Sequence, residues 1–115
     1  MALLTRQNFA LGGLAASYAA AAAGGDTVDN DGRVVMHVKN GGAGTINVTV
    51  TAQVSSVVVE GYGTLTRGNA VVAVPAGAER FIGPFPTRAF NDASGRAAIS
   101  YDVVTSVTVA ALQMA

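Results

Sequence analysis

The chain has 115 residues, of which only 12% are charged, and its seven basic residues balance its seven acidic ones. This neutral composition argues against electrostatic binding of nucleic acid, which requires a basic patch, and the absence of cysteine excludes disulfides and thiolate metal sites. The length predicts one folded domain. A charged fraction well below the usual ~25% indicates an assembly component whose surface is covered by partners.

The N-terminal segment, residues 1–25, is predicted to be an arm that precedes a single β-sandwich domain of residues 26–115. The uncharged stretch from Phe9 to Ala23 follows Arg6 and ends in three alanines, a pattern that also fits a cleaved export signal. It contains few large apolar side chains and is too short to span a bilayer. We therefore favour an extended arm of the mature protein and expect no membrane partner. The arm residues expected to contact a protein partner are Arg6, Phe9, Leu11, Leu14 and Tyr18.

An acidic run, DTVDNDG, extends from Asp26 to Gly32. A calcium loop of the EF-hand type needs oxygen ligands at alternate positions, glycine at the sixth and a bidentate glutamate at the twelfth. With Gly32 at the sixth position, the twelfth is Val38, which cannot bind a cation. The run therefore predicts a solvated turn, with an opportunistic cation site as the alternative. No metal or other cofactor is expected.

From Arg33 onward, apolar and polar residues alternate with the period of two that half-buried strands require. Residues 33–39 and 45–53 flank a glycine-rich connection, and this arrangement predicts a β-hairpin. Further strands are expected within residues 54–63, 70–77, 79–86, 97–103 and 106–114. About seven short strands at roughly 10-residue spacing predict an all-β fold, either an antiparallel β-sandwich or a small barrel.

Candidate catalytic residues are few. His37 is the single histidine, so a zinc site lacks further nitrogen or sulfur ligands. No nucleophile-elbow pattern accompanies it, and we interpret it as a surface or half-buried strand residue. The carboxylates that could form an acid/base pair are scattered singly at Glu60, Glu79, Asp92 and Asp102. The sequence therefore predicts a protein that is not an enzyme.

An aromatic–proline cluster is the remaining apolar feature of the sequence. It comprises Pro75, Pro84 and Pro86 together with Phe81, Phe85 and Phe90. The cluster fits two alternatives, a packed corner of the domain or an apolar contact surface for a partner. Burial of the phenylalanines distinguishes the two.

The run YAAAAAGGDTVDNDGRVVMHVKNGGAGTINVTVTAQ, followed by VVAVPAGAERFIGPFP, FNDASGRAAISY and VTSVTVAAL, resembles a family of small tailed-phage structural proteins. These proteins are similar to capsid decoration (cement) proteins, and the likeness covers nearly the whole chain from about Tyr18. The resemblance implies a β-rich virion protein that is made in the host cytoplasm. It implies binding to the major capsid protein on the outer head surface, often as a trimer, and stiffening of the shell.

Two other classes of protein remain open. One is a different virion component, such as a neck, tail or head-fibre-base protein on the same β scaffold. The other is a secreted adhesive or carbohydrate-binding β-sandwich, in which the alanine run is part of an export signal. For the decoration role, we expect the N-terminal arm to lie along a neighbouring subunit and add a strand to its sheet.

Overall fold

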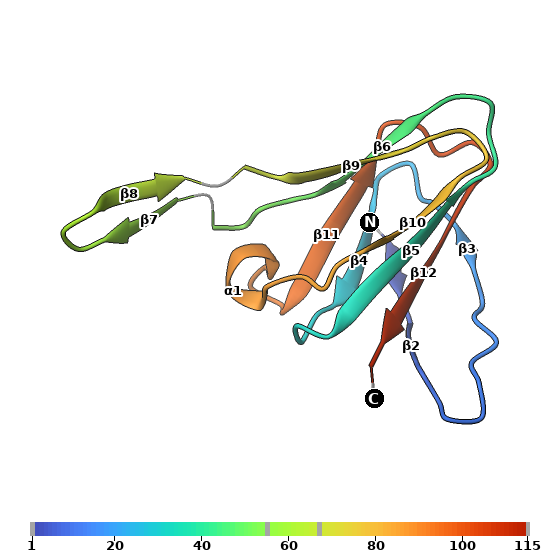
Figure 1. The fold of residues 1–115 in the computed structure, drawn as a ribbon, viewed down its shortest axis with the longest axis horizontal. Helices are drawn as coiled ribbons and strands as arrows, with labels where there is room; N and C mark the ends of the chain where they lie inside the picture. The colour runs from blue at the N-terminus through green and yellow to red at the C-terminus, as the bar shows by residue number, and fades with distance from the viewer. Residues whose placement is uncertain (1, 55, 67, 115) are drawn as a thin grey trace.

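The computed structural model describes residues 2–54, 56–66 and 68–114, and in these ranges the chain forms an all-β, sandwich-like fold (Figure 1). The predicted fold class is confirmed. The strands are β1 (Ala2–Leu4), β2 (Arg6–Asn8), β3 (Ala19–Ala20), β4 (Asp26–Asp29), β5 (Val34–Asn40), β6 (Ile46–Val50), β7 (Ser56–Val59), β8 (Gly63–Thr66), β9 (Ala70–Val74), β10 (Glu79–Ile82), β11 (Arg96–Tyr101) and β12 (Val107–Gln113), and the helix is α1 (Thr87–Phe90).

Two large sheets pack against each other, and a two-stranded sheet projects from them (Figure 1). The first sheet has the order β1-β4-β11-β6-β9. The second has the order β10-β5-β12-β2, and β3 also pairs with β12. Most neighbouring strands are antiparallel, but β1 runs parallel to β4 and β2 runs parallel to β12. The first residues of the chain therefore supply an edge strand to each large sheet.

The core lies between the two large sheets and consists mainly of small aliphatic side chains. Alternate residues of β5 and β6 point into it, and at most 1% of the surface of each is exposed for Val34, Met36, Val38, Val48 and Val50. Burial of one such side chain stabilises the fold by about 1.5–3 kcal/mol. Apolar and polar residues therefore alternate in the sequence because each strand buries one of its two faces in this shared core.

The hairpin predicted for residues 33–39 and 45–53 is wrong. Its two strands lie in different sheets, because β5 pairs with β10 and β12 whereas β6 pairs with β9 and β11. The glycine-rich connection crosses from one sheet to the other, and Asn40 holds it by donating to the carbonyl oxygen of Gly44 at 2.8 Å. Crossing allows the apolar faces of both strands to pack on each other across the core, which pairing side by side within one sheet does not.

The acidic run from Asp26 to Gly32 also differs from its prediction. Its first four residues form β4, between β1 and β11, and Val28 from this strand is fully buried in the core. Only 1% of the surface of Asp26 is exposed, and the hydroxyl of Tyr101 donates to its Oδ2 at 2.8 Å. The bend itself is confined to Asp31 and Gly32. The solvated-turn prediction is therefore wrong for the first half of the run.

The hydrogen bond between Tyr101 and Asp26 predicts a loss of stability at alkaline pH. Burial, followed by the hydrogen bond to Asp26 and the charge of that carboxylate, raises the pKa of Tyr101 above its ordinary value of 10.0. The unfolded chain therefore loses this proton at a lower pH than the folded chain does. The resulting stabilisation is fully present below about pH 10 and declines as the pH rises further.

Substitution of Tyr101 by phenylalanine tests this expectation. At neutral pH we expect the free energy of unfolding to fall by about 1–3 kcal/mol, because the buried Asp26 loses the shorter of its two hydrogen bonds. Above about pH 10 the difference from the wild type should narrow, since the variant has no hydroxyl to ionise. Urea denaturation across this pH range measures both effects, with Tyr62→Phe as the exposed control. If the free energy of unfolding changed equally with pH above about pH 10 in the wild type and in Tyr101→Phe, the raised pKa of Tyr101 would be contradicted.

The aromatic–proline cluster is divided between the interior and the surface. Phe85 and Phe90 are buried, and their ring centroids lie 6.4 Å apart in an edge-to-face arrangement. They form the packed corner that was one of the two predicted alternatives. Phe81 is exposed on the outer face of β10 and stacks on the ring of His37. In the described parts of the chain, no helix is both long enough and apolar enough to cross a membrane.

Candidate functional site

The most prominent surface feature is the hairpin formed by β7 and β8, which extends away from the two large sheets (Figure 1). It continues the ribbon formed by β6 and β9. The cross-strand register places Val57 opposite Leu65 and Val58 opposite Thr64. Since side chains alternate between the faces of a strand, Val57, Val59 and Leu65 share one face, and Val57 and Leu65 are exposed on it.

An apolar hollow of about 340 Å³ lies at the base of this hairpin. It is bordered on one side by Val57 and Leu65 and on the other by Pro86, Arg88 and Ala89, which lie at and around α1. The apolar face of the hairpin is therefore continuous with the surface around Pro86 and Ala89 on the body of the protein. An exposed apolar surface with polar residues at its border is a candidate interaction site.

The molecule is larger than a compact chain of its length. The radius of gyration is 14.9 Å, against about 13 Å for a compact domain. The chain exposes 6395 Å² of surface, which is about 600 Å² more than the roughly 5,800 Å² expected for a monomer of 11.5 kDa. The hairpin β7–β8 and the loop of residues 9–18 are the two segments of the described chain that extend away from the body (Figure 1).

The hairpin was not predicted as a contact surface from the sequence. Residues 54–63 were expected to form a single strand, although the turn Glu60-Gly61-Tyr62 ends β7 and residue 63 already begins β8. Positive φ angles of 83° at Gly61 and 91° at Gly63 allow this tight reversal. The spacing of these two glycines was the signal for a hairpin, but no local pattern indicates that the hairpin leaves the body.

Three described segments of the predicted arm, residues 1–25, are hydrogen bonded along the edges of the chain's own sheets. Residues of β1 pair with β4, and residues of β2 and β3 pair with β12. Between β2 and β3 the chain leaves the sheet as a loop of residues 9–18 (Figure 1). The loop is therefore the part of this segment that projects beyond the chain's own sheets.

The five predicted contact residues have different surroundings in the structure. Arg6 lies 3.6 Å from the carboxylate of Asp31, and the hydroxyl of Tyr18 is hydrogen bonded to Nδ1 of His37 at 2.7 Å. Leu14 is half-buried. Phe9 and Leu11 are exposed on the loop, with Leu11 fully exposed. These two side chains are therefore the exposed apolar members of the predicted set.

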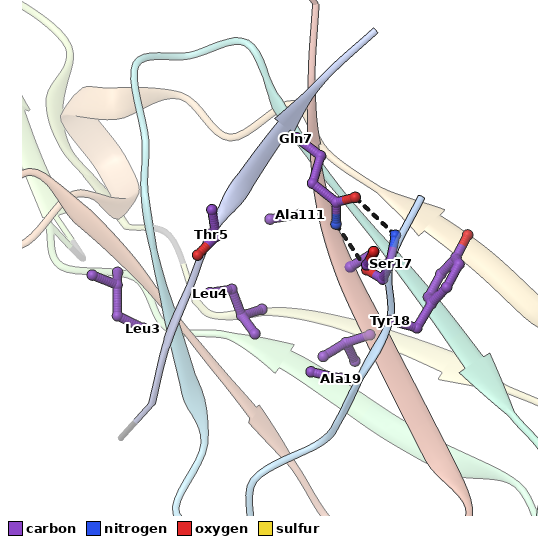
Figure 2. A pocket seen from close by; sticks show the side chains of 10 residues that line it. Leu3, Leu4, Thr5, Gln7, Ser17, Tyr18, Ala19 and Ala111 are labelled. Atoms are coloured by element: carbon purple, nitrogen blue, oxygen red, sulfur yellow. Dashed lines mark hydrogen bonds between the residues drawn. The ribbon is translucent and has the colours of Figure 1, made fainter. Parts of the chain in front are cut away.

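The loop that carries Leu11 is held in place at its base. The carboxamide of Gln7 donates to the carbonyl oxygen of Ser17 and accepts from its backbone N–H, both at 2.8 Å (Figure 2). Near the tip, the N–H of Gly13 donates to the carbonyl oxygen of Ala10 at 3.0 Å and closes a turn. The loop is therefore anchored at its base, and the turn at its tip presents Leu11 to solvent.

A second pocket, of about 420 Å³, lies behind this anchored base. Figure 2 shows Leu4 and Ala19 at opposite sides of it, with Gln7 and Ser17 joined across one end. It separates the strand β2 from the strand β3 along the edge of β12. The pocket is lined mainly by apolar atoms of the N-terminal segment, and its described lining contains no charged side chain.

The carboxylates of the acidic run are each engaged by other groups. The side-chain hydrogen bond from Arg33 is the largest of the effects that hold the pKa of Asp31 below its ordinary value of 3.8, and the charge of Arg6 adds to them. Asp29 forms an ion pair with Arg96 at 3.0 Å. Within residues 2–54, 56–66 and 68–114, no cluster of three or more His, Asp or Glu side chains could hold a metal ion.

His37 lies on the outer face of β5 and is more buried than its alternation predicts, because aromatic rings cover it. Its ring stacks on Phe81 with centroids 4.1 Å apart, and Tyr18 packs edge-on against it. Nε2 lies 3.2 Å from Oε1 of Glu79, without the alignment of a hydrogen bond. Lys39 places its Nζ 4.0 Å from the centre of the Tyr18 ring. This cluster joins the end of the N-terminal loop to the second sheet.

No protein-family model matches the chain, and neither the curated proteins nor the solved structures include a match. Function is therefore inferred from the two exposed apolar projections, the loop bearing Phe9 and Leu11 and the hairpin β7–β8.

Proposed function

We propose that this protein is a structural component of a tailed-phage virion that binds the outer surface of the head and stabilises the lattice of the major capsid protein. The observation that carries the proposal is the pair of apolar projections on a weakly charged β-sandwich, one formed by the loop of residues 9–18 and the other by β7–β8 (Figure 1). A sandwich with two such projections can link neighbouring subunits.

The stabilising effect follows from mass action. Many copies that bind the assembled shell, but not its separate subunits, shift the equilibrium toward the shell. Each contact gains free energy mainly from burial of apolar surface, because the chain has few charges. Of the residues predicted to contact the capsid, Phe9 and Leu11 carry this contact in the proposal, since both are exposed on an anchored loop.

Substitution of Leu11 by aspartate tests the capsid contact. Loss of one buried leucine and burial of a charge should weaken binding to heads by at least about tenfold, which corresponds to about 1.4 kcal/mol. The measurement is the number of copies bound per head after titration of heads that lack the protein. Val103→Asp, which alters an exposed valine elsewhere, is the matched control. Unchanged binding of Leu11→Asp would remove the loop from the proposal.

Copy number separates the decoration role from other virion roles. A decoration protein is present in numbers that scale with the capsomers of the shell, whereas a neck or tail component is present in a few copies at one vertex. Quantitative mass spectrometry of purified particles measures this ratio. The same experiment tests the secreted alternative, because a protein found on particles with its alanine run intact has not been cleaved there.

A further inference from the structure

We propose that two copies of this chain associate about a two-fold axis through the apolar faces of their β7–β8 hairpins, with the tip of each hairpin seated in the hollow at the base of the other. The contact is made by Val57, Leu65 and Tyr62 of one copy and by the surroundings of Pro86 and Arg88 of the other. It does not depend on the proposed capsid role, because the isolated chain carries both halves of the contact.

The hairpin exposes apolar side chains that a partner would cover. A two-stranded sheet is at best marginally stable when isolated in water, and packing on one of its faces stabilises it. Here Val57 and Leu65 face solvent directly opposite each other, and Tyr62 is exposed at the tip.

The charges at the two ends of this hairpin favour a second copy as the partner. Glu60 lies at the tip of the hairpin and Arg88 lies beside the hollow at its base, both exposed. Among the described residues, neither of them forms an ion pair. The tip is therefore acidic, the base is basic, and the surface between them is apolar.

A two-fold axis across the hairpin matches these charges. When two hairpins lie antiparallel, the Glu60 of each copy approaches the Arg88 of the other, and the same ion pair forms twice. A parallel arrangement brings like charges together at both ends and is opposed by repulsion. Shape supports the antiparallel arrangement as well, because each copy supplies one projecting tip and one hollow of about 340 Å³.

Sedimentation velocity of the isolated protein tests the two-fold contact. We expect a species with twice the chain mass of 11.5 kDa that dissociates on dilution. Leu65→Asp should abolish the dimer, whereas Val103→Asp should leave it unchanged. A protein that stays monomeric at all concentrations, or that forms a trimer, overturns the proposal.

Charge reversal tests the orientation of the two hairpins. Glu60→Arg alone and Arg88→Glu alone should each weaken the dimer by about tenfold, because two attractive pairs become repulsive. The double variant should restore the affinity of the wild type. Circular dichroism confirms that each variant is folded. Failure of the double variant to recover, with both single variants folded, overturns the antiparallel arrangement.

Hydrogen exchange locates the contact without substitutions. Amides of residues 56–66 should become more protected as the protein concentration rises, because the dimer covers one face of the hairpin and restrains it. Amides of the loop of residues 9–18 should show no such dependence. The reverse pattern assigns self-association to the loop and overturns the proposal. Both outcomes are obtained without capsids, so they are independent of the head-binding test.

Discussion

Asn40→Asp is expected to lower the free energy of unfolding by about 3–5 kcal/mol, the usual cost of a buried charge without a partner. Only 2% of the surface of Asn40 is exposed. Its Nδ2 donates to the carbonyl oxygen of Gly44 at 2.8 Å and to that of Val74 at 2.9 Å. A carboxylate has nearly the same shape, but it presents an acceptor to these two acceptors. The variant therefore replaces two buried hydrogen bonds with repulsion.

Urea denaturation at neutral pH measures this change. Asn69→Asp is the matched control, because the Oδ1 of Asn69 accepts from the N–H of Ala52 at an exposed position and a carboxylate retains that bond. We expect the control to change stability by less than about 0.5 kcal/mol. The deficit of Asn40→Asp should shrink as the pH falls, because burial disfavours the charged form and a protonated carboxyl can donate once. A deficit below about 1 kcal/mol at neutral pH would contradict the role of Asn40 in joining the two sheets.

Gly83→Ala is expected to destabilise the protein by about 3 kcal/mol, through backbone strain and steric overlap. The φ angle of Gly83 is 132°, a region that residues with a Cβ rarely adopt. A Cβ at this position would lie 2.8 Å from the carbonyl oxygen of Val34 and 3.2 Å from the Cα of Val35. Both neighbours are backbone atoms of β5, in the middle of the fold, and they cannot move without disturbing its pairing with β12.

Two other glycines provide controls that separate strain from overlap. Gly77 has a φ of 72°, but a Cβ added there would have no neighbour within 4 Å, so Gly77→Ala should show the cost of strain alone, about 1 kcal/mol. Gly24 has neither feature, and Gly24→Ala should be close to neutral. Thermal or urea denaturation of the three variants gives the order of stability. Equal loss for Gly83→Ala and Gly77→Ala would show that close packing against β5 contributes nothing.

The candidate contact residues stay a prediction, and the structure shows only where each of them lies. Phe9 and Leu11 are exposed as an arm residue should be, but Arg6 and Tyr18 interact with Asp31 and His37 of the same chain. These interactions join residues that are far apart in the sequence, so a local pattern cannot reveal them. A segment of small residues can pack on a sheet of its own chain or on a sheet of a neighbouring subunit. Its composition does not distinguish the two.

The hairpin β7–β8 shows a similar limit. Its strands and its turn residues are visible in the sequence as valines, threonines and spaced glycines. Whether its apolar face is covered depends on where the ribbon of β6 and β9 ends relative to the body (Figure 1). That position is a property of the whole fold. Alternation alone predicts that one face of the hairpin is buried in a core, but in the structure Val57 and Leu65 on that face are exposed.

The sequence by itself determined the all-β class and the approximate positions of the strands after Arg33, because the period-two alternation of apolar residues is a local signal of a strand with one buried face. The tertiary structure decided which strands pair. It placed β5 beside β12 rather than beside β6, formed the edges of both sheets from the first residues of the chain, and left one hairpin outside the core. The physical reason is that alternation shows which face of a strand is buried but not which strands lie beside it. Burial of that face contributes the same free energy in either of the two sheets that share the core.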